Sequence, residues 1–595
     1  MFSAARRELR GRAVEGLVRS VLRPLSSGGR LARGPLPSGR RLLLLHLDGV
    51  GRGQLESALQ RGYLPTLQAF LADGRYKVSR CRAGAPSSTP AFQAGLLYGV
   101  TADIPGYTWY DKKKRRPVRM DSGADARALE ADLTARGRPL LADGSVYCSI
   151  FSGGARPRRW ALTGIGEKLG LKDIEVDPAR GTGQLPALRD LAAAGLVHSA
   201  TLGRIASSLG IDAVQGLIET ARWARHIGSL QHEDHFYLNR LLTECLFPEF
   251  AANATVVDVA RGTPIVYSCF VGYDEYAHRR GPESRTALTK LWELDRALGR
   301  IFAAVAAVPE LNYEIYLFSD HGQAKTRPAE EILGETMAEH LLCDSPLRGR
   351  PGLGAHGSQA ALCVGYGGAG GGATAAVAQQ ARRLRQLARA LPEPLGKIAL
   401  GLARRAARPL DAAAADDVRA EGPLMLVPAG DLAHVYLTEV EEPVPEAGLR
   451  VRQPGLLERC AQSLAVGVVL FRGDKAGSVF ALGAGRRFDL RDPHDAAALN
   501  ALIGHELAAT YAIDLISCPS AGDLVLVGAG APGGQTVAYP WEFGSHGGLA
   551  PEELETFMVH PAELGDQPFA QVKRPAELHD FFEERGGRDR RSLVA

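Results

Sequence analysis

The sequence predicts an α/β fold in which a mostly parallel sheet is sandwiched by helices and interrupted by helical and loop insertions. Three apolar runs, Leu42–Leu47, Pro264–Gly272 and Tyr313–Ser319, are each followed within two residues by an aspartate. Runs of this length without alternation are typical of strands buried on both faces of a sheet. The stretch Thr286–Val305 carries apolar residues at helical spacing. Alternating strands and helices favour a parallel sheet.

A chain of 595 residues is too long for one ordinary core, so two domains or one domain with insertions are expected. Later strand candidates are Ala433–Thr438, Val466–Phe471 and Asp523–Val527. The expected segments are a basic N-terminal tail at 1–39, an α/β core at 40–345 with an insertion at about 122–262, a Gly/Ala-rich and basic helical insertion at 346–430, the remainder of the core domain at 431–560 and a C-terminal tail at 561–595.

The charges are nearly balanced, with 70 basic and 66 acidic residues. A dedicated nucleic-acid-binding domain would be strongly basic, so we expect no specific nucleic-acid partner. The 8 cysteines are scattered and form no C-x-x-C pair, which argues against a disulfide framework or a cysteine-type zinc site. No secretory signal or membrane-spanning run is visible, and we expect a cytoplasmic protein.

A basic stretch at 381–408, rich in arginine, leucine and alanine, is typical of an amphipathic helix. Contact with an anionic membrane surface is one possible role for it. A solvated helix packed by one face is the simpler alternative. The run Lys112–Arg116 also has two interpretations, an electrostatic guide for an anionic ligand or a solvated loop, and the loop is favoured.

The aspartates at the three strand ends, Asp48, Asp274 and Asp320, indicate a site. In parallel α/β sheets, ligands bind at the carboxyl ends of the strands. Three carboxylates gathered at three strand ends repel one another unless cations neutralise them. This repetition favours a metal site over three unrelated turns.

Histidines accompany these carboxylates. His278 lies four residues after Asp274, a spacing that places both on one face of a helix, and His321 directly follows Asp320. Oxygen and imidazole ligands suit zinc, with manganese or iron as alternatives. Far downstream, His546 stands in a glycine-rich loop, and His356, in a similar sequence, competes with it for the same role.

A hydroxyl nucleophile is expected in the segment Pro86–Ala91, which contains Ser87, Ser88 and Thr89. A hydroxyl at the start of a helix, beside metal ions, can attack phosphorus, and the helix N-terminus favours a phosphate. An ordinary N-cap followed by proline gives the same sequence, and both interpretations can hold for one residue.

The order of these motifs, L-D-G, P-S-S-T-P, D-x-x-x-H, S-D-H-G and G-S-H-G, resembles the alkaline phosphatase superfamily. The stretch from Asp48 to Asp111 resembles its type I phosphodiesterase/nucleotide pyrophosphatase branch. The resemblance implies an alkaline phosphatase-like fold and two divalent metal ions, most simply zinc. It implies one metal site of Asp274, His278 and His546, and another of Asp48, Asp320 and His321. Thr89 falls at the nucleophile position when Gly99 is aligned with a family glycine, with Ser88 as the fallback.

The function implied is hydrolysis of a small anionic phosphoester, most simply a phosphodiester, through a phospho-enzyme intermediate. The site would then use the Thr89 oxygen both as nucleophile and as a group facing the metals. Three alternatives stay open: a phosphomonoesterase, a phospholipid headgroup hydrolase, and a non-catalytic binding protein on the same scaffold. The sequence specifies neither the substrate nor the oligomeric state.

Overall fold

A computed structural model describes residues 12–16, 18–19, 35–100, 103–155, 247–342 and 423–587, and the statements below concern those residues. The central sheet has six strands in the spatial order β2-β17-β7-β1-β6-β5. These strands are β2 (Tyr76–Arg82), β17 (Glu555–Pro561), β7 (Tyr313–Phe318), β1 (Arg41–Leu47), β6 (Ile265–Phe270) and β5 (Ser145–Tyr147). β7, β1, β6 and β5 run parallel, and β17 is antiparallel to both of its neighbours. The predicted fold class is confirmed.

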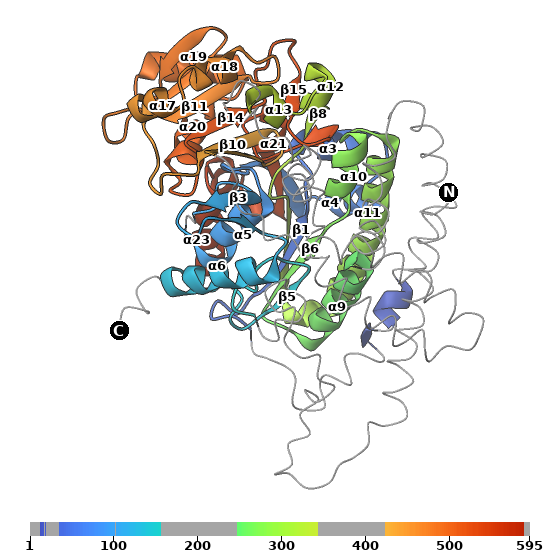
Figure 1. Ribbon diagram of the computed structural model, residues 1–595. Helices are drawn as coiled ribbons and strands as arrows, with labels where there is room; N and C mark the ends of the chain where they lie inside the picture. The colour runs from blue at the N-terminus through green and yellow to red at the C-terminus, as the bar shows by residue number, and fades with distance from the viewer. Residues whose placement is uncertain are drawn as a thin grey trace, which may run out of the picture.

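Helices cover both faces of this sheet (Figure 1). One apolar core joins the sheet to α4 (Pro65–Leu71), α9 (Phe247–Arg261) and α11 (Arg285–Ala306). A second core, on the opposite face, joins it to α5 (Thr89–Tyr98), α6 (Gly123–Arg136) and α23 (Pro575–Arg585). The three predicted strands correspond to β1, β6 and β7, and the predicted helix Thr286–Val305 corresponds to α11.

A second six-stranded sheet lies above the carboxyl end of the first in Figure 1. It is entirely antiparallel, in the order β13-β12-β11-β14-β10-β9. Its strands are β13 (Arg486–Asp489), β12 (Val479–Gly483), β11 (Val468–Arg472), β14 (Leu524–Val527), β10 (Leu432–Leu437) and β9 (Leu424–Pro428). The helices α17 (Glu446–Arg452), α18 (Leu456–Gln462), α19 (Pro493–Ile503) and α20 (Ala508–Ser517) accompany it. The three later strand candidates therefore form β10, β11 and β14 of a separate antiparallel sheet.

Three expected segment boundaries need correction. The insertion at about 122–262 contributes β5 to the central sheet and α9 to its helical layer. The insertion at 346–430 ends in β9, an edge strand of the second sheet. The C-terminal segment 561–595 is not a simple tail, because α22 (Gln567–Ala570) and α23 follow β17 and bury Phe569, Leu578 and Phe582. Apolar side chains at helical spacing in α23 pack against α5.

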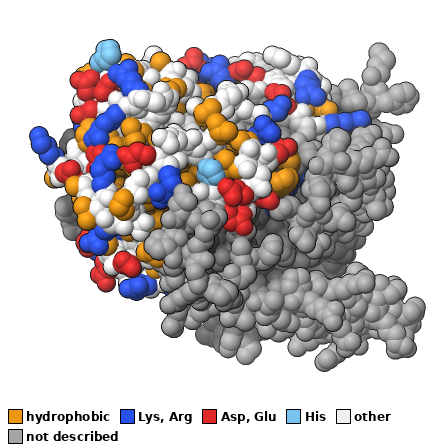
Figure 2. All heavy atoms as spheres, turned by 45° about the horizontal axis from the view of Figure 1, so that its top comes forward, with side chains coloured by type: hydrophobic (Ala, Val, Ile, Leu, Met, Phe, Trp, Pro, Cys, Tyr) orange, Lys and Arg blue, Asp and Glu red, His pale blue; other side chains and the backbone are white. Residues whose placement is uncertain are grey.

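The described surface carries mixed charge. Figure 2 shows basic and acidic side chains interspersed over the face that it presents, as the balanced composition predicts. Among the described residues, no helix is both long enough and apolar enough to cross a membrane. The basic stretch 381–408 and His356 lie outside the described residues.

Buried polar contacts join the second sheet to the segment that follows α5. Lys112 Nζ lies 3.0 Å from both carboxylate oxygens of Asp523, and Lys112 is only 8% exposed. Lys112 therefore belongs to a buried ion pair and is not part of a solvated loop, the interpretation that the sequence favours. Asp103 accepts hydrogen bonds from the backbone N–H and the hydroxyl of Ser520. His434 Nδ1 accepts from Gly522 N–H, and its Nε2 lies 3.1 Å from Pro105 O. Because Nδ1 accepts, Nε2 carries the proton and donates.

We expect acid to destabilise the protein through His434. Burial lowers the pKa of His434 from 6.5 to about 4. The unfolded chain therefore binds a proton on His434 more tightly than the folded chain does. The free energy of unfolding has its full contribution from neutral His434 above pH 6.5 and loses that contribution as the pH falls toward 4. The loss reaches about 3 kcal/mol. Urea unfolding of wild type and His434→Gln at pH 7.5 and 4.5 measures it, and an unchanged pH dependence in the variant would contradict it.

Candidate active site

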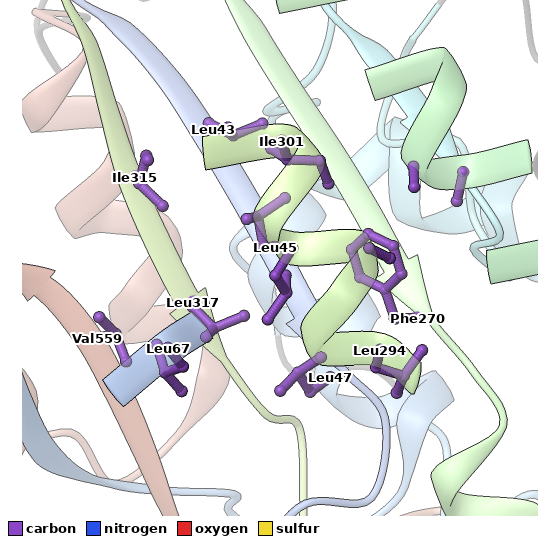
Figure 3. Packing of buried hydrophobic residues seen from close by; sticks show 14 of the residues in the cluster. Leu43, Leu45, Leu47, Leu67, Phe270, Leu294, Ile301, Ile315, Leu317 and Val559 are labelled. Carbon is purple, nitrogen blue, oxygen red and sulfur yellow. The ribbon is translucent and has the colours of Figure 1, made fainter. Parts of the chain in front are cut away.

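β1 fixes the position of Asp48. Leu43, Leu45 and Leu47 alternate along β1 and pack against helix α11, beside Phe270 of β6 and Leu317 of β7 (Figure 3). Leu42 and Leu44 enter the core on the other face. Because alternate residues of a strand face the same side, His46 shares the face of Leu42 and Leu44. β1 is hydrogen-bonded to parallel strands on both sides, so the start of the following loop is held on both sides.

The three aspartates come together because their strands are neighbours. Asp48 follows β1, Asp320 follows β7, and Asp274 lies in α10 (Tyr273–Arg280), directly after β6. Asp320 is fully buried and Asp48 is 8% exposed. Burial, together with the charges of Asp320 and Asp274, raises the pKa of Asp48 well above its usual value. Gly49 has a φ of 74°, and an added Cβ there would overlap the Asp274 carboxylate, so only glycine allows this approach.

Thr89 is the first residue of α5, with Ser88 at the N-cap and Pro90 next in the first turn. Proline suits the first turn of a helix because its φ is already helical and its missing N–H leaves no bond unmade. Thr89 Oγ1 lies 3.3 Å from Asp48 Oδ1 and 3.3 Å from His321 Nε2. Thr89 is partly exposed, whereas Ser88 is buried at 2% exposure. Of the two hydroxyls, Thr89 is the one that a ligand can reach.

His321 and His546 stack face to face, with ring centroids 3.6 Å apart. Strand pairing explains why His546 lies beside His321. β16 (Gly544–Ser545) pairs with β8 (Ala324–Pro328), placing Ser545 opposite Ala324, three residues after His321. His546 Nδ1 lies 2.7 Å from the carbonyl oxygen of Ser87, and its Nε2 lies 3.8 Å from Asp274 Oδ1. Burial and the neighbouring His321 lower the pKa of His546 to about 3, which keeps this ring neutral.

His278 lies one helical turn after Asp274 on α10, as its spacing predicts, with Nε2 3.2 Å from Asp274 Oδ2. Its Nδ1 lies 2.9 Å from Gly544 O and 3.2 Å from Glu542 Oε2. Burial disfavours the charged ring, but Glu542 and Asp274 raise the pKa of His278 well above its usual value. Burial would likewise raise the pKa of Asp274, yet His278, His546 and His321 hold it below its usual value.

All the predicted site residues within the described chain thus converge on one place. Two groups of possible ligand atoms, each within 4.8 Å of one another, are Asp274, His321 and His546, and His46, Asp48 and Asp320. This division differs from the one implied by the resemblance, because His321 stacks on His546 and His46 lies 2.9 Å from Asp320. The assignment of each ligand to one of two metal sites stays a prediction.

Sequence reasoning missed three polar residues at this site. His46 contacts Asp320, Gln323 donates to Asp274, and Glu542 contacts His278. A signal existed for His46, the polar residue in an otherwise apolar strand, two positions before Asp48. No comparable local signal marks Gln323 or Glu542, since both depend on pairing between β8 and the segment around β16.

The sequence profile of one family, described as type I phosphodiesterase / nucleotide pyrophosphatase, matches residues 42–383, more than half of the chain. The chain belongs to this family. The resemblance seen in the motifs is therefore confirmed, and the chain is an enzyme of the phosphoric ester hydrolase class. Within the matched range lie Asp48, Thr89, Asp274, His278, Asp320 and His321.

Among solved structures, the chain is similar to phosphonoacetate hydrolase from Sinorhizobium meliloti 1021. The complex with phosphonoformate has 15% identity and a TM-score of 0.39, and the complex with phosphonoacetate has 14% identity and a TM-score of 0.37. Both alignments cover 94% of this chain and 98% of the other. No curated protein matches the sequence significantly.

Proposed function

We propose that this enzyme hydrolyses phosphodiesters by nucleophilic attack of Thr89, at a site that holds two divalent cations, zinc in the simplest case. The observation that carries the proposal is the position of Thr89 Oγ1, partly exposed at the start of α5 and 3.3 Å from both Asp48 Oδ1 and His321 Nε2. A nucleophilic hydroxyl needs this combination of access and a nearby proton acceptor.

The side chains present fit divalent cations. Three aspartates and the imidazoles of His46, His278, His321 and His546 meet in a largely buried space. Carboxylate oxygens and neutral imidazoles are the donors that zinc accepts. Burial, followed by the charges of Asp320 and Asp274, raises the pKa of Asp48, and bound cations would offset that negative charge. When bound, two such cations stabilise negative charge on the attacking and leaving oxygens of a phosphoryl transfer.

The residues of the chain account for the remaining chemistry. Thr89 Oγ1 forms a bond to phosphorus as its hydroxyl proton passes to Asp48 Oδ1. The bond to the leaving alkoxide breaks, and the alkoxide takes a proton from solvent to become the alcohol. The N-terminal turn of α5 turns backbone N–H groups and the positive end of its dipole toward the transferred phosphoryl group. Water then attacks phosphorus and releases one proton to solvent, the bond to Oγ1 breaks, and Thr89 takes back the proton held by Asp48. The products are a phosphomonoester and an alcohol.

Removal of metal tests the proposal. We expect purified protein to contain about two divalent metal ions per chain by elemental analysis. It should hydrolyse bis-p-nitrophenyl phosphate faster than p-nitrophenyl phosphate, lose that activity on exhaustive chelation, and regain it with Zn²⁺ or Mn²⁺. Full activity after verified removal of metal would contradict the proposal. Faster cleavage of the monoester would favour a phosphomonoesterase instead.

A further inference from the structure

A pair of buried carboxyl groups lies directly behind the candidate site. Asp431 precedes β10 in the second sheet, and Glu553 lies in α21 (Pro551–Leu554), just before β17. Both are fully buried. Asp431 Oδ1 and Glu553 Oε2 accept the same backbone N–H, that of Gly548, at 2.9 and 3.0 Å. Two buried carboxyls this close cannot both ionise cheaply, so the pair retains a proton. In agreement, burial raises the pKa of both groups, that of Asp431 to about 6.

Glu553 accepts hydrogen bonds from the two loops that carry Thr89 and His546. The Ser87 hydroxyl, two residues before Thr89, donates to Glu553 Oε2 at 2.7 Å. Gly547 N–H donates to the Ser87 hydroxyl at 2.9 Å, and Ala550 N–H donates to Glu553 Oε1. Glu553 thus joins the segment before the nucleophile to the segment after His546.

The same network sets the orientation of the His546 ring. Its Nδ1 lies 2.7 Å from the Ser87 carbonyl oxygen, which can only accept, so Nδ1 carries the proton. Nε2 is then left with its lone pair on the side of Asp274 and His321. A partner that fixes the tautomer and angle of an imidazole in this way governs its strength as a ligand.

The second sheet contacts this hydrogen-bond network through the turn between β9 and β10. Gly430, in the β9–β10 turn, has a φ of 84°, and an added Cβ would overlap the carbonyl oxygen of His546. At Gly547, an added Cβ would press on the carbonyl oxygen of Ala429. The β9–β10 turn and the His546 loop are therefore in backbone contact, and Asp431 extends from that turn to Gly548.

We propose that Glu553, held by Asp431, is a positioning residue that sets His546 and Thr89 relative to each other. The inference rests on the proposed function for the roles of His546 and Thr89, but the hydrogen-bond network itself does not. Loss of the Glu553 carboxyl would remove the acceptor of the Ser87 hydroxyl and of the Ala550 N–H, and would leave the Gly548 N–H with Asp431 as its acceptor. The direct contacts of Ser87 with Gly547 and His546 would then hold the two loops together without support from the Glu553 carboxylate.

Three variants test this proposal: Glu553→Ala, Asp431→Asn and Asp295→Ala. Asparagine at position 431 keeps an oxygen that can accept the Gly548 N–H. Its NH₂ group can donate to Glu553 in place of the shared proton, so the variant mimics the protonated pair. Asp295 is the matched control, because it is fully buried and accepts the N–H groups of Thr66 and Leu67 in α4, in the helical layer on the opposite face of the sheet from α5.

Zn²⁺ affinity, from competition with a chromophoric chelator, should fall about 10–100-fold in Glu553→Ala and stay within about threefold of wild type in the other two variants. The kcat for bis-p-nitrophenyl phosphate should fall with it, while KM changes little. The proposal would be overturned by wild-type Zn²⁺ affinity in Glu553→Ala. It would also be overturned if Asp295→Ala or Asp431→Asn lost as much Zn²⁺ affinity as Glu553→Ala.

Hydrogen exchange separates this inference from the proposed function. In Glu553→Ala, the amides of Gly547, Gly548 and Ala550 should exchange at least about tenfold faster than in wild type, with no such change in Asp295→Ala. This result is expected even if wild type binds no Zn²⁺ and cleaves no phosphodiester, an outcome that would remove the proposed function alone. Unchanged exchange at these three amides would overturn the positioning role.

Discussion

Replacing Thr89 with alanine should lower kcat/KM for bis-p-nitrophenyl phosphate by at least about 10³-fold. The variant lacks the only atom placed to attack phosphorus in the proposed mechanism, Oγ1 at 3.3 Å from Asp48 and His321. Thr89 is partly exposed, so its methyl and hydroxyl contribute little to stability. The melting temperature and the metal content should therefore stay close to those of wild type. Steady-state kinetics, thermal unfolding and elemental analysis measure these three quantities.

Ser88→Ala is the matched control for this experiment. Ser88 is buried at the N-cap of α5, and its hydroxyl makes no capping hydrogen bond and has no hydrogen-bond partner among the described residues. Its replacement by alanine should therefore change both the stability and the chemical step little. Rapid mixing adds a second test, because a phosphorylated Thr89 should be recoverable from quenched wild type by peptide mass spectrometry. Retained turnover in Thr89→Ala together with lost turnover in Ser88→Ala would transfer the nucleophile to Ser88.

Replacing Asp48 with asparagine should abolish turnover and at the same time stabilise the metal-free protein. Burial and the charges of Asp320 and Asp274 raise the pKa of Asp48 well above its usual value, so the folded state binds this proton more tightly than the unfolded chain. That contribution to stability is present below the unfolded pKa and is lost as the pH rises through the folded pKa. At pH 7.5 asparagine removes this buried charge and the free-energy cost of burying it, so the metal-free variant should melt at a higher temperature than metal-free wild type.

Thermal unfolding after chelation, at pH 7.5, measures this effect. Asp523→Asn serves as a control of opposite sign, since Asp523 is also a fully buried carboxylate but is paired with Lys112 at 3.0 Å. Breaking that pair leaves a buried charge without its partner and should destabilise by about 3–5 kcal/mol. A lower melting temperature for metal-free Asp48→Asn than for metal-free wild type would contradict the expectation. So would turnover near the wild-type level.

The sequence alone determined the core of the fold and the chemical character of the site. Uninterrupted apolar runs identified β1, β6 and β7, because strands buried on both faces need no polar alternation. The aspartate after each run indicated where the site lies, since the carboxyl ends of neighbouring parallel strands share one edge of the sheet. Helical spacing related Asp274 to His278. These signals are local, and each spans only a few residues.

The tertiary structure decided everything that depends on pairing between distant segments. An apolar run at Val466–Phe471 looks the same whether it joins a parallel or an antiparallel sheet, so the second sheet was not predictable from it. The place of His546 depends on the pairing of β16 with β8, and the stacking on His321 follows from that register. Glu553 and Asp431 carry no local motif at all. Their importance comes from sharing the N–H of Gly548, a contact that exists only once two distant parts of the chain have packed together.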